Sequence, residues 1–169
     1  MTDRTYHVCS IRANDRVALC LWFTNARDGI ERDEPGRIVS FSTMEEVRAY
    51  ATLKGLHLST EGVTEYHLDD VLTWCDDPQA ETIGYGLFLD TWNLLVDVGL
   101  DSEAQSLFSG VQTNSDSLYD KLFWGSNIPA MTPPGEAFAP SWSEDDLERL
   151  AKVMRLGLRM LLEELGRPE

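Results

Sequence analysis

The sequence predicts an α+β fold: a small antiparallel sheet at the N-terminal end, packed with a helix, followed by a mainly helical C-terminal half. Two runs rich in β-branched and aromatic residues flank Asn14-Asp15, and apolar residues recur at helical spacing from residue 82 onward. The 169 residues are 43% apolar and 25% charged, as in an ordinary globular protein of one domain. We therefore expect a single domain over residues 1–169, β-rich in 1–60 and helical in 61–169.

The N-terminal part is predicted to contain a hairpin and one or two further strands. Residues 6–13 and 17–24 form the predicted hairpin, and both faces of its strands are apolar, so both faces should be covered. Residues 25–37 are polar and predict a loop. A third strand is expected at residues 37–41, and a short one at residues 56–58.

Helix start and stop signals divide the remaining chain. Ser42 with Glu45, or Thr43 with Glu46, offers a capping box that opens a helix ended by Gly55. Ser143 with Asp146 opens the last helix in the same way. Between them, helices are expected over residues 68–74, 82–98 and 115–124, and a proline-rich loop over residues 125–142.

The charge of the chain is concentrated in one segment. The sequence holds 14 Lys and Arg against 29 Asp and Glu, for a net charge of −15. Residues 55–120 contain thirteen acidic residues and no Lys or Arg. Such a balance argues against binding nucleic acid or anionic membranes, which both require a basic face. It favours recognition of a strongly basic protein, because opposite charges steer encounter and reject wrong partners.

Compartment and redox state follow from what the sequence lacks. No apolar signal region follows Met1, and no stretch approaches 18 consecutive apolar residues. The three cysteines form no Cys-x-x-Cys pair and leave an odd one over. We therefore expect a cytoplasmic protein with reduced cysteines.

Common catalytic motifs are missing from the sequence. It has no phosphate-binding glycine loop, no nucleophile elbow, no zinc-protease helix and no calcium-loop frame, so we expect no catalytic residue, metal or cofactor. One alternative is a small hydrolase that uses Cys75 with His67. Another is a metal-dependent enzyme in which His57 or His67 joins the neighbouring carboxylates, and a third is an acidic adaptor protein.

Aromatic residues surround the proline-rich loop. Long loops inside compact domains are often functional, and Trp and Tyr are common interface anchors. The competing interpretation is that these rings close over the core. The rings are Tyr119, Phe123, Trp124, Phe138 and Trp142.

Two passages carry a resemblance to a known class of proteins. Residues 38–51 (IVSFSTMEEVRAYA) and residues 92–97 (WNLLVD) lie in a small, acidic, α+β chain. This chain resembles an immunity protein of a bacterial contact-dependent inhibition or other polymorphic-toxin system. The resemblance implies a non-enzymatic protein that binds a cognate toxin domain, expected to be a basic nuclease, and occludes its active site. The partner-binding residues that we predict are Glu61, Glu65, Asp69, Asp70, Asp76, Asp77, Asp90, Asp97, Tyr119, Trp124 and Trp142.

Overall fold

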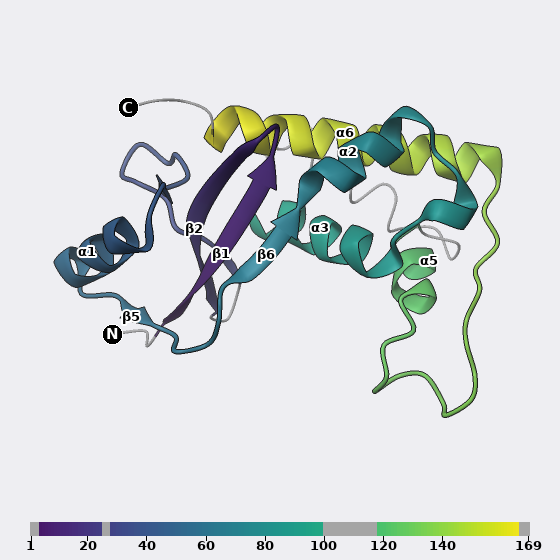
Figure 1. The fold of residues 1–169 in the computed structure, drawn as a ribbon, viewed down its shortest axis with the longest axis horizontal. Coiled ribbons are helices and arrows are strands. Elements are labelled where there is room, and N and C mark those ends of the chain that lie inside the picture. Colours follow the sequence, from purple (N-terminus) through teal and green to yellow (C-terminus); the bar gives the residue numbers. More distant parts are fainter. Residues whose placement is uncertain (1–3, 25–27, 100–117, 166–169) are drawn as a thin grey trace. The chain divides into compact units, whose positions relative to one another are not determined.

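The α+β prediction is confirmed by the computed structural model, which describes residues 4–24, 28–99 and 118–165. The chain divides into two compact units, residues 1–69 with 160–169 and residues 70–159, which we name the sheet unit and the helical unit. The single domain expected over residues 1–169 stays a prediction. Figure 1 shows the course of the chain through its strands and helices.

The predicted hairpin is present at the start of the sheet unit. Strands β1 (Thr5–Ala13) and β2 (Arg16–Thr24) pair antiparallel, with Cys9 opposite Cys20. Asn14 and Asp15 form the turn with φ of 52° and 60°, the left-handed conformation that suits a tight two-residue hairpin. The hairpin therefore forms where the Asn-Asp pair predicts it.

The sheet around this hairpin is mixed, so the prediction of an antiparallel sheet was wrong in this respect. β3 (Gly29–Ile30) and β4 (Ser40–Phe41) pair antiparallel with β2. β5 (His57–Leu58) and β6 (Thr64–His67) pair parallel with β1. Side-chain periodicity identifies a strand but not its partner or direction, which depend on a long crossover connection.

Strand extents also differ from the predictions. β3 lies inside the segment that was predicted as a loop, and the third strand shrinks to Ser40–Phe41, although Arg32 and Ile38 form an isolated bridge before it. β6 was not predicted, because its Thr-Glu-Tyr-His sequence lacks the alternation of apolar and polar residues by which strands are recognised. Short strands of this kind are defined by their neighbours rather than by their own residues.

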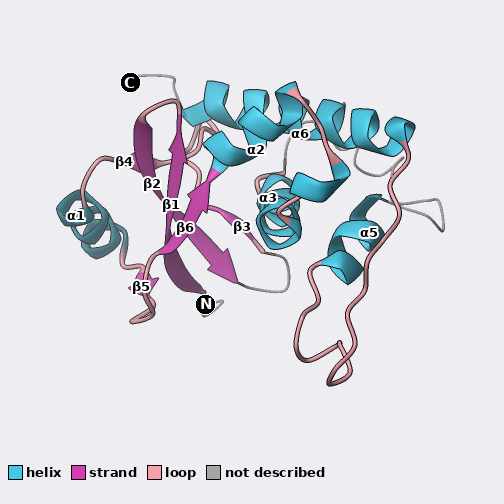
Figure 2. Ribbon diagram, turned by 45° about the vertical axis from the view of Figure 1, so that its right-hand side comes forward, coloured by secondary structure: helices cyan, strands magenta, loops and turns pink. Residues whose placement is uncertain are grey.

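Helix α1 (Met44–Lys54) covers one face of the sheet (Figure 2). Of the two capping boxes that the sequence offers, Thr43 with Glu46 forms: the Glu46 N–H donates to Thr43 Oγ1 at 3.2 Å, and Glu46 Oε2 accepts from the Thr43 N–H at 3.2 Å. Gly55 ends the helix at a φ of 65°. Val47 of α1 packs with Tyr6 and Leu21 in the core of this layer.

The other face of the hairpin is also covered. Cys9, Ile11 and Cys20 are 3%, 2% and 0% exposed. The prediction that both faces are buried is therefore confirmed, and the free thiols of Cys9 and Cys20 act as small apolar side chains in the interior.

The helical unit packs apolar helix faces together. Helix α2 (Leu68–Asp76) leads into this unit, followed by the 3₁₀ turn η1 (Ala80–Thr82) and by α3 (Tyr85–Asp97). Helix α5 (Leu118–Gly125) packs against α3, and α6 (Glu144–Leu165) follows the long loop. The predicted helix start at residue 115 lies outside the described residues. The largest side chains in the core include Trp92, Leu122, Met154 and Leu158.

The capping prediction for α6 is confirmed. Ser143 Oγ accepts from the Asp146 N–H at 3.2 Å, and Asp146 Oδ2 accepts from the Ser143 N–H at 3.0 Å. No helix among the described residues has the length and apolar character needed to cross a membrane.

Candidate protein-binding surface

Aromatic side chains in the helical unit form a continuous series that runs from the core to the surface. We name Trp92, Tyr119, Phe123, Trp124 and Phe138 the aromatic row. Successive ring centroids along it lie 6.0, 6.4, 5.3 and 5.1 Å apart. Trp92 is fully buried, whereas Trp124 and Phe138 are 41% and 37% exposed. The row therefore presents anchored rings to solvent, as interface anchors require.

The side chain of Asn127 fixes the exposed end of the aromatic row. Its Nδ2 donates to the Phe138 carbonyl at 3.1 Å, and its Oδ1 accepts from the Phe138 N–H at 2.7 Å. Nδ2 also donates to the Gly125 carbonyl at 2.9 Å. Because one amide joins both ends of the loop, Phe138 is held beside Trp124 before any partner binds, which lowers the entropy cost of binding.

Trp142 makes different contacts from Trp124. Its Nε1 donates to the Tyr85 hydroxyl at 2.9 Å, and the Lys121 ammonium lies 5.5 Å from its ring centroid. Lys121 also forms an ion pair with Asp146 at 2.7 Å. Trp142 thus ties the end of the loop to α3 and α5 of this unit, and its part in binding a partner stays a prediction.

A polar stripe on α3 lies beside the aromatic row. The predicted residues Asp90 and Asp97 flank Asn93 at helical spacing, and Asn93 Oδ1 accepts from the Tyr119 hydroxyl at 3.4 Å. Asp90 is exposed, and partial burial of its carboxyl raises its pKa. Asp90 has no cationic partner among the described residues, so its charge faces solvent uncompensated.

The remaining predicted acids of the helical unit lie on α2 or directly after it. Asp76 lies 3.4 Å from Arg155 of α6, and Asp77 accepts from the Gln79 amide at 3.1 Å. Asp70 is exposed on α2. Asp76 is therefore the only one of these three with a cationic partner among the described residues.

The predicted acids of the sheet unit have local partners. Glu61 lies 3.1 Å from His7, and Glu65 lies 3.2 Å from His67. Asp69 accepts from the Asn14 N–H at 2.7 Å and so supports the hairpin turn. The structure thus places Asp90, Asp97, Tyr119 and Trp124 in the helical unit, where Tyr119 links the polar stripe of α3 to the aromatic row, but it places Glu61, Glu65 and Asp69 in the other unit.

The chemistry of Cys75 does not suit nucleophilic catalysis. Its thiol is 2% exposed, and burial raises its pKa to about 11, so it is protonated at neutral pH. His67 is held by Glu65 on β6. No group of three or more His, Cys, Asp or Glu side chains among the described residues is arranged to hold a metal ion.

Sequence reasoning did not single out Asn127 or Met131. Met131 is 54% exposed in the loop that carries Phe138, and Asn127 has a φ of 49°. Asn adopts this left-handed conformation more readily than most residues, and its residue type was the only local signal that pointed to Asn127.

Comparisons with protein-family models, curated proteins and solved structures gave no match.

Proposed function

We propose that this protein is a cytoplasmic immunity protein that binds a basic toxin domain, a nuclease, and blocks its active site without catalysis. The observation that carries this proposal is the exposed carboxylate of Asp90 on α3, in the same unit as the half-exposed rings of Trp124 and Phe138, whose aromatic row contacts α3 through Tyr119. The carboxylate of Asp90 has no cationic partner among the described residues, and Trp124 and Phe138 present anchored apolar rings in the same unit. Asp90 and Asp97 belong to residues 55–120, which contain no lysine or arginine. Carboxylates and aromatic anchors together fit a basic, phosphate-binding groove.

The inhibition would work by charge mimicry and occlusion. Carboxylates at Asp90 and Asp97 take the positions that substrate phosphates occupy in the nuclease groove, and the basic side chains there pair with them. Trp124, Phe138 and Met131 bury apolar area at the edge of the groove. The raised pKa of Asp90 indicates that its charge is unfavourable in the free protein, and a cationic partner relieves this cost.

The two other classes of function have less support. A hydrolase would need an ionised Cys75, and burial keeps this thiol protonated. An adaptor with a merely solubilising acidic surface would not need rings held half-exposed by Asn127. Both remain distinguishable from the inhibitor by experiment.

The test uses the gene that lies directly upstream, since immunity genes follow their toxin genes. Its C-terminal domain is expressed in a bacterial host with and without this protein, and growth is measured. Growth that depends on this protein, together with a stoichiometric complex of the two purified proteins, is the expected result. If the neighbouring domain is not toxic, or is toxic with this protein present, the inhibitor proposal fails.

Single variants then locate the binding surface. Asp90→Lys and Trp124→Ala should each weaken the complex about tenfold or more, and the effect of Asp90→Lys should fall at high salt. Glu148→Lys makes the same charge change at an exposed position of α6, and Leu53→Ala removes an apolar side chain that is 81% exposed in the sheet unit. Both controls should bind like the wild type. If the controls weaken the complex as much as Asp90→Lys and Trp124→Ala do, the interface lies elsewhere.

A further inference from the structure

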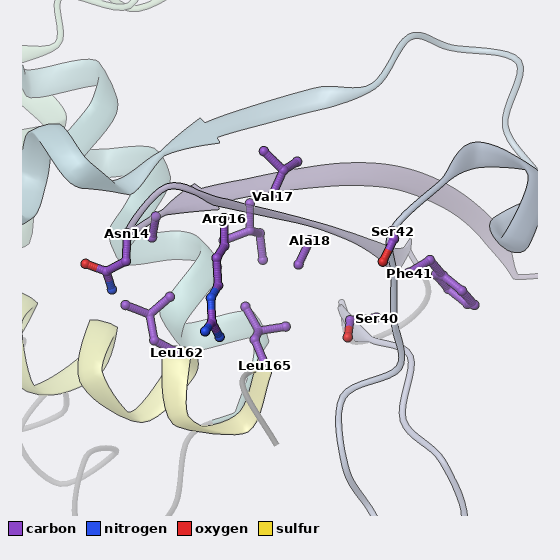
Figure 3. A pocket seen from close by; sticks show the side chains of 11 residues that line it. Asn14, Arg16, Val17, Ala18, Ser40, Phe41, Ser42, Leu162 and Leu165 are labelled. Carbon is purple, nitrogen blue, oxygen red and sulfur yellow. The ribbon is translucent and has the colours of Figure 1, made fainter. Parts of the chain in front are cut away.

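The sheet unit contains a cavity of about 470 Å³ at the start of β2 that the proposed function does not use. Figure 3 shows it between β2, β4 and the end of α6. Val17, Phe41, Leu162 and Leu165 give it apolar walls, and its size is typical of ligand sites. A ligand for this cavity must therefore carry an apolar group.

Among the described residues that line this cavity, Arg16 is the one with a charged side chain, and it is exposed. Figure 3 shows its side chain extending from β2 toward Leu162 and Leu165. Within the part of the chain that the structure describes, Arg16 forms no ion pair, although the protein carries 29 acidic residues. An unpaired guanidinium against apolar walls is suited to a carboxylate, which it can hold with two parallel hydrogen bonds.

A second cavity, of about 590 Å³, lies on the other side of β4 and provides a comparison. Its basic residue Arg37 is paired with Asp33 at 2.8 Å. Glu164, which also lines it, is paired with Arg32 at 2.8 Å. Arg37, the basic residue of this second cavity, is thus neutralised by a partner within the protein, whereas no ion pair neutralises Arg16 among the described residues.

Within the described ranges of the chain, the first cavity also lies at an edge of the sheet that is not paired by another strand. The Leu21 carbonyl accepts from the Glu31 N–H at 2.7 Å, on the side of β2 that faces β3 and β4. Strand residues alternate, so Val17 directs its N–H and C=O to this same side. The described pairing between β2 and β4 begins only at Leu19 with Phe41, and Val17 is 47% exposed. Val17 can therefore pair with an added strand.

We infer that this cavity binds the carboxy-terminal end of an extended peptide. The peptide adds a short strand at Val17, places its terminal carboxylate on Arg16, and packs its last apolar side chain against Leu162 and Leu165. The direction of the peptide follows from the sheet. β4 is antiparallel to β2 and runs toward the start of β2, where Arg16 lies. A peptide strand in the same direction therefore brings its carboxyl end to Arg16. β4 occupies the edge from Leu19 onward, so only the last two or three residues of the peptide are bound.

The probe is N-acetyl-valyl-seryl-leucine with a free carboxylate, titrated into the full ¹⁵N-labelled chain and followed by amide NMR shifts. Such a short contact should give a dissociation constant of roughly 0.1–1 mM. Shifts are expected at Arg16, Val17, Phe41 and Leu165. The C-terminal amide of the same peptide should bind about tenfold more weakly, since it lacks the charge that Arg16 recognises.

Two matched variants and a free acid complete the experiment. Arg16→Gln should weaken binding about tenfold, while Arg37→Gln, in the neighbouring cavity, should leave it unchanged. No binding, equal binding of acid and amide, or unchanged binding to Arg16→Gln would overturn the assignment. If octanoate binds with dependence on Arg16 and the peptide does not, the cavity takes free aliphatic acids and the peptide assignment is wrong.

Discussion

At the scale of single residues, Gly125 controls the packing that supports the aromatic row. A Cβ at this position would lie 2.3 Å from two carbons of the Tyr85 ring, far inside van der Waals contact. The Tyr85 hydroxyl accepts from Trp142, which closes the loop. Gly125 is therefore required by close approach, and its replacement would disturb both α5 and the loop that carries Phe138.

Replacement of Gly125 by Ala should lower the free energy of unfolding by about 1–3 kcal/mol, because the Tyr85 ring must move. Gly86, in the first turns of α3, is the matched control: nothing lies within 4 Å of a Cβ there. Gly86→Ala should raise stability by about 0.5–1 kcal/mol, since alanine loses less entropy in a helix. Urea denaturation followed by tryptophan fluorescence measures both, and a Gly125→Ala protein as stable as Gly86→Ala would contradict this account.

At the scale of elements, the N-terminus of α6 depends on Asp146. Burial disfavours its ionised form, but hydrogen bonds from Lys121 and Ser143 outweigh that effect and lower its pKa. A carboxyl whose pKa is lowered by folding stabilises the protein above its unfolded pKa of about 3.9. This stabilisation is lost as the pH falls through the folded pKa.

Replacement of Asp146 by Asn should therefore lower the free energy of unfolding at pH 7 by about 1–2 kcal/mol. The difference from the wild type should shrink as the pH is lowered from about 5 toward 2, where both side chains are neutral. Asp145→Asn is the control, because Asp145 is exposed and lies 3.7 Å from Arg149. Denaturation curves across this pH range test the prediction, which fails if the two variants show the same loss.

At the scale of the whole molecule, the charge of −15 should reduce stability through self-repulsion. Sodium chloride screens this repulsion, and most of the screening is complete by about 0.3 M. We therefore expect the free energy of unfolding to rise by on the order of 1 kcal/mol between about 0.02 and 0.3 M sodium chloride. Urea denaturation at each salt concentration measures the change, and a fall in stability over this range would mean that the ion pairs outweigh the repulsion.

Local signals in the sequence determined which segments are helices and where the hairpin lies. The Asn14-Asp15 turn, the capping residues of α1 and α6, and the stop at Gly55 each act over a few residues, so the sequence alone reveals them. The same holds for the apolar residues on both faces of the hairpin strands, which predict that both faces are buried. Candidate surface residues such as Asp90 and Trp124 could likewise be predicted from their residue type and their position in the sequence.

Tertiary structure alone decided the direction of β5 and β6, the grouping of the predicted site residues, and the different contacts of Trp124 and Trp142. These depend on contacts between residues far apart in the chain, such as Trp142 with Tyr85 and Asn127 with Phe138. The sequence by itself determined that the protein is strongly acidic and has an α+β fold, because composition and apolar periodicity do not depend on which distant segments meet. Which carboxylates and rings share a surface is a property of packing, and packing is fixed only when distant segments meet.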